Sequence, residues 1–403
     1  MSVLNILEEK LAETKKQGRF REFLNLERGV QDKPWATSHG HHGERRLNVW
    51  CSNDYLAMSH HPKVLLATTE AVNRVGLGTC GARSISGTSV YHSELETLLA
   101  SAYGKESALL FTTGFGANDA TLSTLCDAIP DLIVFSDELN HASMIYGIRY
   151  SKAEKKIFRH NDVAHLAELL QAADPARPKL IAFESLYSMD GDFAPLAQIV
   201  ALAEQYQALT YLDEIHSAGV YGERGLGYAE QLGLLDKITI IQGGFGKSYG
   251  AAGGYIAAPR SVVEAVRSWA PAFVFSTSSP APVVAAALAS FKYNLEHDTQ
   301  RKHLLAIVDH LKTGLRAAGI PLVSADSHIL PLRVGDPYRN KHISKVLLDE
   351  HDIYVQPVNA PTVPAGSERL RVTPTSAHSH ADVETFLAAL GRVWAANDLR
   401  RAG

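Results

Sequence analysis

The sequence predicts an α/β protein in which a large domain with a mostly parallel central sheet precedes a smaller α+β domain. From about residue 50 the chain repeats an apolar run, a glycine-containing turn and a helical stretch. The apolar runs are continuous rather than alternating, which indicates strands that are covered on both faces. After about residue 290 the runs become shorter and the helical stretches more polar. We therefore expect an N-terminal helix and loop segment at 1–50, a large domain at 51–290 and a small domain at 291–403.

The expected strands of the large domain follow one another at the spacing of βαβ units. They cover 108–111, 132–136, 179–184, 209–213, 238–242 and 254–258, with helices such as 164–172 and 196–206 between several of them. In the small domain we expect a long polar helix at 292–318 and strands at 329–334, 353–356 and 369–373. Because ligands of parallel sheets bind at the carboxyl ends of the strands, functional side chains are expected directly after these runs.

The composition describes an ordinary globular protein of 403 residues, 46% hydrophobic and 20% charged. A net charge of -4 gives no electrostatic reason to expect nucleic acid or an anionic membrane as a partner. No apolar run reaches the ~18 residues of a membrane span. Cys51, Cys80 and Cys126 are too few and scattered for a disulfide framework, so we expect free thiols and a cytoplasmic protein. The histidines between residues 39 and 42 predict a solvated loop, and no metal site is expected.

Lys247 is the most informative residue of the chain. It lies in the run Gly-Gly-Phe-Gly-Lys-Ser-Tyr-Gly at 243–250, and Asp213 closes an earlier apolar run. A lysine in a glycine-rich turn and an acid at a strand end are typical of proteins that hold pyridoxal phosphate. The lysine forms a Schiff base with the cofactor aldehyde, and the carboxylate keeps the pyridine nitrogen protonated. A phosphate-binding P-loop fits poorly, because Ile241 stands where that motif needs glycine. On this motif alone, a solvated surface lysine remains an alternative.

Other candidate residues also follow expected strands. The run Thr113-Gly114-Phe115 precedes a helix, where backbone N–H groups can bind a phosphate. His141 could lie against a cofactor ring, although on its own a polar loop histidine is the better interpretation. His216 comes one turn after Asp213, within reach of an oxygen on the same ring. These positions extend the hypothesis of a cofactor site at the strand ends.

Two arginines, Arg369 and Arg371, alternate with Leu370 in the last expected strand. We interpret them as facing opposite ways, one as a bidentate carboxylate clamp and the other in solvent.

Together these residues resemble the α-oxoamine synthase family of pyridoxal-phosphate enzymes, and within it most closely the 5-aminolevulinate synthases. The resemblance extends from about Gly18 to Ser379. It rests on the runs Cys51-Ser-Asn-Asp-Tyr-Leu56, Ile85-Ser-Gly-Thr88, Leu139-Asn-His-Ala-Ser-Met-Ile145, Ala182-Phe-Glu-Ser185, Tyr187-Ser-Met-Asp-Gly-Asp192, Val355-Gln-Pro357 and Pro361-Thr-Val-Pro364. It implies the fold-type I transferase fold, pyridoxal 5'-phosphate as cofactor, and a homodimer with active sites at the subunit interface.

The resemblance also implies a role for each candidate residue. Lys247 is the Schiff-base lysine and the base, Asp213 pairs with the ring nitrogen, His141 stacks on the ring, and His216 bonds its phenolic oxygen. The remaining implied cofactor ligands are Thr113, Gly114, Phe115, Ser188, Ser276 and Thr277, with Phe275-Ser-Thr-Ser278 reaching the phosphate from the neighbouring subunit. The implied substrate-binding residues are Arg21, Asn53, Ala82, Ser84, Ile85, Ser188, Thr362 and Arg371. Arg21 matches the arginine that grips a succinyl carboxylate, and Arg371 holds the amino-acid carboxylate.

The sequence departs from the resembled pattern at four positions. Ala82 and Ser84 stand where threonine and asparagine are typical, and both changes shrink the side chain near the acyl group. Tyr146 replaces a typical glutamate, and Gly244 replaces a phosphate-binding threonine. We expect a wider acyl site and weaker retention of the cofactor.

The expected reaction condenses glycine with an acyl-CoA, releasing CoA and carbon dioxide and leaving an aminoketone. Succinyl-CoA is the leading candidate, which would give 5-aminolevulinate for tetrapyrrole biosynthesis; a larger acyl-CoA is the alternative. An aminotransferase and a non-catalytic binding protein on the same scaffold are less favoured alternatives. Release of free CoA from glycine and a thioester would distinguish these classes.

Overall fold

The computed structural model describes residues 2–20, 22–40, 43–397 and 399. The chain forms two compact units. The large unit contains Asp54–Tyr187 and Phe193–Arg301, and the small unit contains Met1–Asn53, Ser188–Asp192 and Lys302–Gly403. These bounds differ from the expected domains, because the N-terminal segment and the short segment 188–192 group with the C-terminal part of the chain. In the described residues, no helix is long and apolar enough to cross a membrane.

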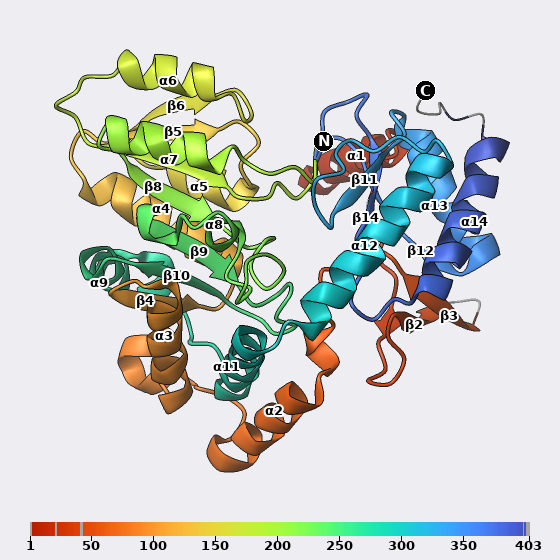
Figure 1. Ribbon diagram of the computed structural model, residues 1–403, viewed down its shortest axis with the longest axis horizontal. Helices are drawn as coiled ribbons and strands as arrows, with labels where there is room; N and C mark the ends of the chain where they lie inside the picture. Colours follow the sequence, from red (N-terminus) through yellow and green to blue (C-terminus); the bar gives the residue numbers. More distant parts are fainter. Residues whose placement is uncertain (1, 21, 41–42, 398, 400–403) are drawn as a thin grey trace. The chain divides into compact units, whose positions relative to one another are not determined.

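A twisted sheet with the strand order β4-β10-β9-β8-β7-β5-β6 is the centre of the large unit (Figure 1). Its strands are β4 (Ser107–Phe111), β5 (Ile133–Asp137), β6 (Glu154–Phe158), β7 (Lys179–Glu184), β8 (Leu209–Asp213), β9 (Ile240–Gly244) and β10 (Gly254–Ala258). The β10 strand is antiparallel to β4 and β9, and the other neighbouring pairs are parallel. The mostly parallel sheet is thus as predicted, and the expected bounds of β7, β8 and β10 agree with the structure.

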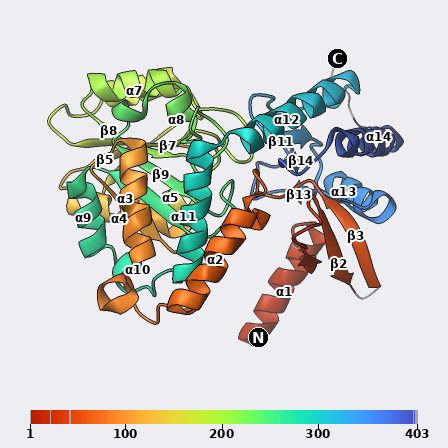
Figure 2. The same ribbon diagram turned by 60° about the horizontal axis from the view of Figure 1, so that its bottom comes forward.

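Helices cover both faces of this sheet, and each face has its own apolar core. One core receives side chains from α3 (Val90–Tyr103), α6 (Val163–Gln171), α7 (Leu196–Gln205) and α11 (Ala281–Glu296). The other receives side chains from α4 (Gly114–Ala128), α5 (Ala142–Arg149), α9 (Arg260–Trp269) and α10 (Pro271–Val274). The large unit also contains α2 (Pro62–Val75), which runs beside α11 (Figure 2), and the short α8 (Tyr228–Gln231). A sheet buried on both faces explains the continuous apolar strands in the sequence.

The small unit contains two small sheets packed with helices. Strands β1 (Leu26–Glu27), β2 (Trp35–Gly40), β3 (Gly43–Val49) and β12 (Ile353–Tyr354) form one sheet, and β11 (Leu330–Arg333), β14 (Arg369–Val372) and β13 (Gln356–Val358) form the other. The helices are α1 (Val3–Lys16), α12 (Thr299–Ala317), α13 (Pro337–His351) and α14 (His380–Ala396), with α12 belonging to this unit from Lys302 onward. The core lies between α12, α13, α14 and the strands.

Two local expectations are wrong. The single helix expected at 292–318 is divided between α11, which ends at Glu296, and α12, which begins at Thr299. The loop expected around residue 39 is a β-hairpin, in which β2 pairs with β3 and the His39 ring contacts Glu27 and Glu44. His41 and His42 lie outside the described residues.

Candidate active site

Lys247 lies in a tight turn between β9 and β10. The turn is closed by backbone hydrogen bonds from Ala251 N–H to Phe245 O at 2.9 Å and from Gly250 N–H to Lys247 O at 3.0 Å. Gly250 has a φ of 62°, and a Cβ on it would lie 2.0 Å from the Ser59 nitrogen. Only glycine fits this position, so the glycine-rich sequence around Lys247 is a consequence of close backbone packing.

Asp213 ends β8, which neighbours β9 in the sheet. Its carboxylate is buried and accepts hydrogen bonds from the Asn118 side-chain nitrogen at 2.7 Å and the Ile215 N–H at 2.8 Å. Burial raises the pKa of Asp213 to about 6, while these two donors and the positive charge of Lys247 act in the opposite direction. A cationic ring nitrogen beside this carboxylate would also oppose the effect of burial, lowering the pKa of Asp213 and favouring its ionised form.

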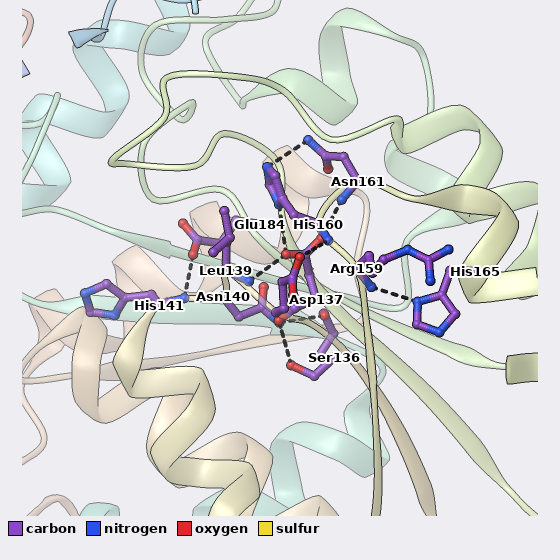
Figure 3. Close-up of polar contacts among 12 residues, drawn as sticks. Ser136, Asp137, Leu139, Asn140, His141, Arg159, His160, Asn161, His165 and Glu184 are labelled. Atoms are coloured by element: carbon purple, nitrogen blue, oxygen red, sulfur yellow. Dashed lines mark hydrogen bonds and ion pairs between the residues drawn. The ribbon is translucent and has the colours of Figure 1, made fainter. Parts of the chain in front are cut away.

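His141 is the N-cap residue of α5 and its side chain is exposed. Its backbone N–H donates to Glu184 Oε1 at 2.6 Å, as Figure 3 shows. Its ring Nδ1 lies 2.7 Å from Ser143 Oγ, and the Phe115 ring stands edge-on at 6.4 Å between centroids. Desolvation by surrounding protein atoms and the charge of Lys247 lower the pKa of His141. The neutral ring therefore predominates near neutral pH.

The loop that carries His141 is held in place by hydrogen bonds to Asp137, a buried carboxylate at the end of β5. Asp137 accepts hydrogen bonds from the Leu139 N–H at 2.8 Å and the Asn161 N–H at 3.0 Å (Figure 3). The His160 Nδ1 lies 2.9 Å from the same carboxylate. Loops after two neighbouring strands are thereby joined, which restricts the position of His141.

His216 is buried, and its Nδ1 lies 2.8 Å from the Tyr55 hydroxyl. This contact orients the imidazole ring of His216, and the role of the ring toward a cofactor stays a prediction.

The N-terminus of α4 begins directly after β4. Thr113 caps it by accepting a hydrogen bond from Gly116 N–H at 2.9 Å, and the first-turn N–H groups provide a partial positive charge. The Ile215 side chain lies against this turn, since a Cβ on Gly114 or on Gly244 would come within 2.6 or 2.7 Å of Ile215 Cδ1. The two glycines thus let the Ile215 side chain pack beside the helix N-terminus, where the N–H groups of the first turn can bind a phosphate. With Lys247 and Asp213 nearby in the same unit, the residues fit pyridoxal phosphate.

Gly244 provides a testable consequence of this packing. We expect Gly244→Thr alone to weaken cofactor binding, because its side chain would collide with Ile215 Cδ1. Combined with Ile215→Ala, the threonine hydroxyl has room to bond the phosphate and should tighten binding about 10-fold relative to Ile215→Ala alone. The measurement is the dissociation constant of the cofactor by absorbance titration. Equal constants for the double variant and Ile215→Ala would show that other donors already satisfy the phosphate.

The residues predicted to lie near the acyl group form part of an exposed loop in the large unit. Ala82 forms an antiparallel bridge with Thr277, and Ser278 N–H donates to Gly81 O at 2.9 Å. Ser84 and Ile85 are exposed. This loop thus pairs with the 275–278 segment. A cavity is lined by Ser276 and Thr277 together with residues around the start of α4, among them Thr112 and Gly116.

In the small unit, Arg369 and Arg371 are both buried on β14. Arg369 donates to Met189 O at 2.9 Å and pairs with Asp190 at 2.8 Å. Arg371 donates to Ser188 O at 2.7 Å and to Asn53 Oδ1 at 3.0 Å.

The expectation that the two arginines face opposite ways, one in solvent, is wrong. Residues two apart in a strand point to the same face, and both arginines bind the 188–190 segment. Thr362, another predicted substrate residue of this unit, is exposed, and its N–H donates to Asn359 O. Arg21 lies outside the described residues.

Sequence reasoning assigned no role to the residues that support Asp213 and His141. Glu184 was expected at the carboxyl end of a strand, and it does end β7, but its bond to His141 was not predicted. Asn118, Ser143 and Tyr211 gave no such signal, because polar residues within a helix or strand have many roles. Their importance follows only from hydrogen bonds between distant segments.

Comparison with known proteins agrees with this arrangement. Residues 46–390 match the family described as aminotransferase class I and II. The 5-aminolevulinate synthase of Rhodobacter capsulatus is 49% identical over 395 residues, covering 96% of this chain and 95% of that protein. The 5-aminolevulinate synthase of Paracoccus denitrificans is 49% identical over 401 residues, covering 98% of each chain.

A solved structure of SPT, serine palmitoyltransferase, with its PLP internal aldimine is 31% identical. It superposes with a TM-score of 0.93, covering 99% of this chain and 100% of that chain. The fold-type I transferase fold predicted from the sequence is therefore confirmed. Since these matches cover almost the whole sequence, the chain belongs to the aminotransferase class I and II family and, within it, to the pyridoxal-phosphate-dependent α-oxoamine synthases.

Proposed function

We propose that this protein condenses glycine with succinyl-CoA and releases CoA, carbon dioxide and 5-aminolevulinate. The observation that carries the proposal is the 49% identity to 5-aminolevulinate synthases over nearly the full length of both chains. The α-carbon of glycine forms a bond to the thioester carbonyl carbon as the C–S bond breaks. The carboxylate of the glycine unit then leaves as carbon dioxide, and a proton takes its place.

The residues of this chain supply binding, orientation and proton transfer. When bound, the cofactor supplies an electron sink for the carbon next to the amino group. We assign to the Nζ of Lys247 the removal of the glycine α-proton. Asp213 holds the ring nitrogen, His141 lies against the ring, and His216 bonds its phenolic oxygen. The phosphate is assigned to the α4 N-terminus, including Thr113, Gly114 and Phe115.

The substrate carboxylate is assigned to Arg371 with Asn53 and Ser188. Arg369 is committed to the Asp190 carboxylate and the Met189 carbonyl, whereas Arg371 donates to Ser188 and Asn53, the two other residues assigned to the amino acid. A buried guanidinium is stabilised by an anion in bidentate geometry. The contacts therefore favour Arg371 over Arg369 as the clamp.

Free CoA release tests the proposed reaction directly. The cofactor-loaded protein is mixed with glycine and each member of an acyl-CoA series, and thiol release and carbon dioxide are measured. We expect both products with succinyl-CoA, and neither when glycine is omitted. Turnover of an amino acid with a 2-oxo acid and without CoA release would instead identify an aminotransferase.

Acyl choice is a separate prediction, supported by the small side chains of Ala82 and Ser84. Fewer polar contacts near the acyl group should permit measurable turnover with at least one acyl-CoA larger than succinyl-CoA. The change Ala82→Thr with Ser84→Asn should shift the ratio of kcat/KM values toward succinyl-CoA. The matched control Ser86→Asn, on the same exposed loop, should leave the ratio unchanged. Strict succinyl specificity of the unmodified protein would refute the wider site and leave Arg21 as the determinant.

We also propose a homodimer in which Ser276 and Thr277 serve the cofactor phosphate of the partner subunit. The bridge between Ala82 and Thr277 supports assigning the loop that carries Ala82 and Ser84 to the active site of the partner subunit as well. The cavity that Ser276 and Thr277 line beside Thr112 and Gly116 of the same chain supports the opposite arrangement, a site built within one chain. Subunit exchange can decide between the two.

Mixing Lys247→Ala with Thr277→Ala is expected to restore activity. If Thr277 acts across the interface, one site of each heterodimer carries both changes and the other carries none. Specific activity should then exceed that of both parents, measured as CoA release after exchange has been verified by mass spectrometry. Thr277→Ala must first be impaired on its own. With that impairment and complete exchange, unchanged activity would mean that each chain builds its own site.

We also propose a cytoplasmic location, on the evidence of the cysteines. Cys51, Cys80 and Cys126 are free thiols in the structure, as is usual in reducing compartments.

A further inference from the structure

Asn118, on α4, connects two of the cofactor residues through hydrogen bonds. Its side-chain nitrogen donates to Asp213 Oδ2 at 2.7 Å and to Ser143 Oγ at 2.9 Å. Its side-chain oxygen accepts from the Tyr211 hydroxyl at 2.7 Å. All four side chains are buried. Each hydrogen of the Asn118 amide therefore has a defined acceptor.

The orientation of this amide follows from its partners. An ionised carboxylate only accepts hydrogen bonds, so the NH₂ group must face Asp213. Burial keeps the pKa of Tyr211 well above its usual value, so its hydroxyl stays protonated and donates to the amide oxygen. Flipping the amide would place its oxygen against the carboxylate. Tyr211 and Asp213 thus fix the direction in which Asn118 donates.

Ser143 connects Asn118 to the His141 ring through hydrogen bonds. The Ser143 backbone N–H donates to His141 Nδ1 at 3.2 Å, and a backbone nitrogen is always a donor. The Ser143 hydroxyl accepts from Asn118 and lies 2.7 Å from the same Nδ1. Its single hydrogen then points to Nδ1. With Nδ1 accepting, the proton of the neutral ring is on Nε2.

We propose that Asn118 and Ser143 act as one positioning unit, which ties the Asp213 carboxylate to the His141 ring and holds that ring with its proton on Nε2. The unit thus fixes the Asp213 carboxylate and the His141 ring, the two groups assigned to the cofactor ring, relative to each other. Loss of either member should release the same constraint. This inference rests on the cofactor roles of Asp213 and His141 given under the proposed function.

The tautomer is tested by nitrogen NMR of the holoenzyme labelled with ¹⁵N-histidine. The signals of His141 are identified by their loss in His141→Asn. We expect the cross-peak pattern of an Nε2–H ring near pH 7. A ring protonated on Nδ1, or on both nitrogens, would overturn the proposal whatever the substrate of the enzyme is.

The coupling is tested by a double-mutant cycle with Asn118→Ala and Ser143→Ala. Each single change should raise the dissociation constant of pyridoxal phosphate about 10-fold, as for loss of one hydrogen bond to a charged group. The double variant should stay near about 10-fold, whereas independent sites would give about 100-fold. An additive loss would overturn the positioning unit. If Asn118→Ala does not fold, Tyr211→Phe replaces it, because it removes only the donor that orients the amide.

Asn294→Ala is the matched control. Asn294 is also a buried asparagine of the large unit, but its side-chain nitrogen donates to the Ser290 carbonyl within α11. Its removal should leave the His141 tautomer unchanged and the dissociation constant within about twofold. If the tautomer and the cycle behave as expected but no CoA is released with glycine, the proposed substrates are wrong and the positioning unit stands.

Discussion

Replacing Lys247 by alanine is expected to reduce kcat by at least about 10⁴-fold. A positioned base alone contributes about 10²–10⁴-fold, and the same change removes the covalent attachment of the cofactor. The turn itself should survive, because it is closed by backbone hydrogen bonds and by the tight packing of Gly250. The measurement is CoA release with glycine and succinyl-CoA, with folding verified by circular dichroism.

Borohydride provides the chemical counterpart of this test. Reduction of the unmodified holoenzyme should fix the cofactor to the peptide that contains Lys247, and reduction of Lys247→Ala should fix none there. Lys237→Ala is the control, because the Lys237 side chain forms an exposed ion pair with Glu204 on the same unit. Its kcat should change by less than about twofold. Label on another lysine, or a colourless protein that stays colourless with added cofactor, would refute the assignment.

Arg371→Leu is expected to raise the glycine KM and lower kcat/KM by at least about 30-fold. Removing one partner of a buried, hydrogen-bonded charge pair typically costs about 2–5 kcal/mol, which corresponds to about 30-fold to several thousand-fold. The glycine KM of Arg371→Lys should lie between those of the unmodified protein and Arg371→Leu, since lysine keeps the charge but loses the planar fork. The measurement is the glycine dependence of CoA release at saturating acyl-CoA.

Arg369→Leu separates substrate binding from folding in this comparison. Arg369 is buried on the same strand, but its guanidinium pairs with Asp190. Its loss leaves that carboxylate without its partner, so it should mainly lower Tm. If Arg369→Leu raises the glycine KM and Arg371→Leu does not, the roles of the two arginines are reversed.

The sequence by itself was sufficient for the scaffold of the large unit. The runs 179–184, 209–213 and 254–258 coincide with β7, β8 and β10 because strands buried on both faces need uninterrupted apolar residues. Lys247 and Asp213 became candidate site residues for a related reason. Polar groups directly after buried strands lie at one edge of the sheet, so a linear pattern already predicts their proximity. The strand period also shows which way Arg369 and Arg371 face, because residues two apart in a strand point to the same face. The prediction that they face opposite ways misapplied this rule.

Tertiary structure alone decided what supports these residues and which segments belong together. The N-terminal segment joins the small unit because β3 pairs with β12, a contact between residues about 300 positions apart. Segment 188–192 joins it through Arg369 and Arg371. Asn118 binds Asp213 and Ser143 from the first turns of a helix after a different strand. Local propensity depends on neighbouring residues, whereas these hydrogen bonds exist only once distant segments have packed, so no local pattern records them.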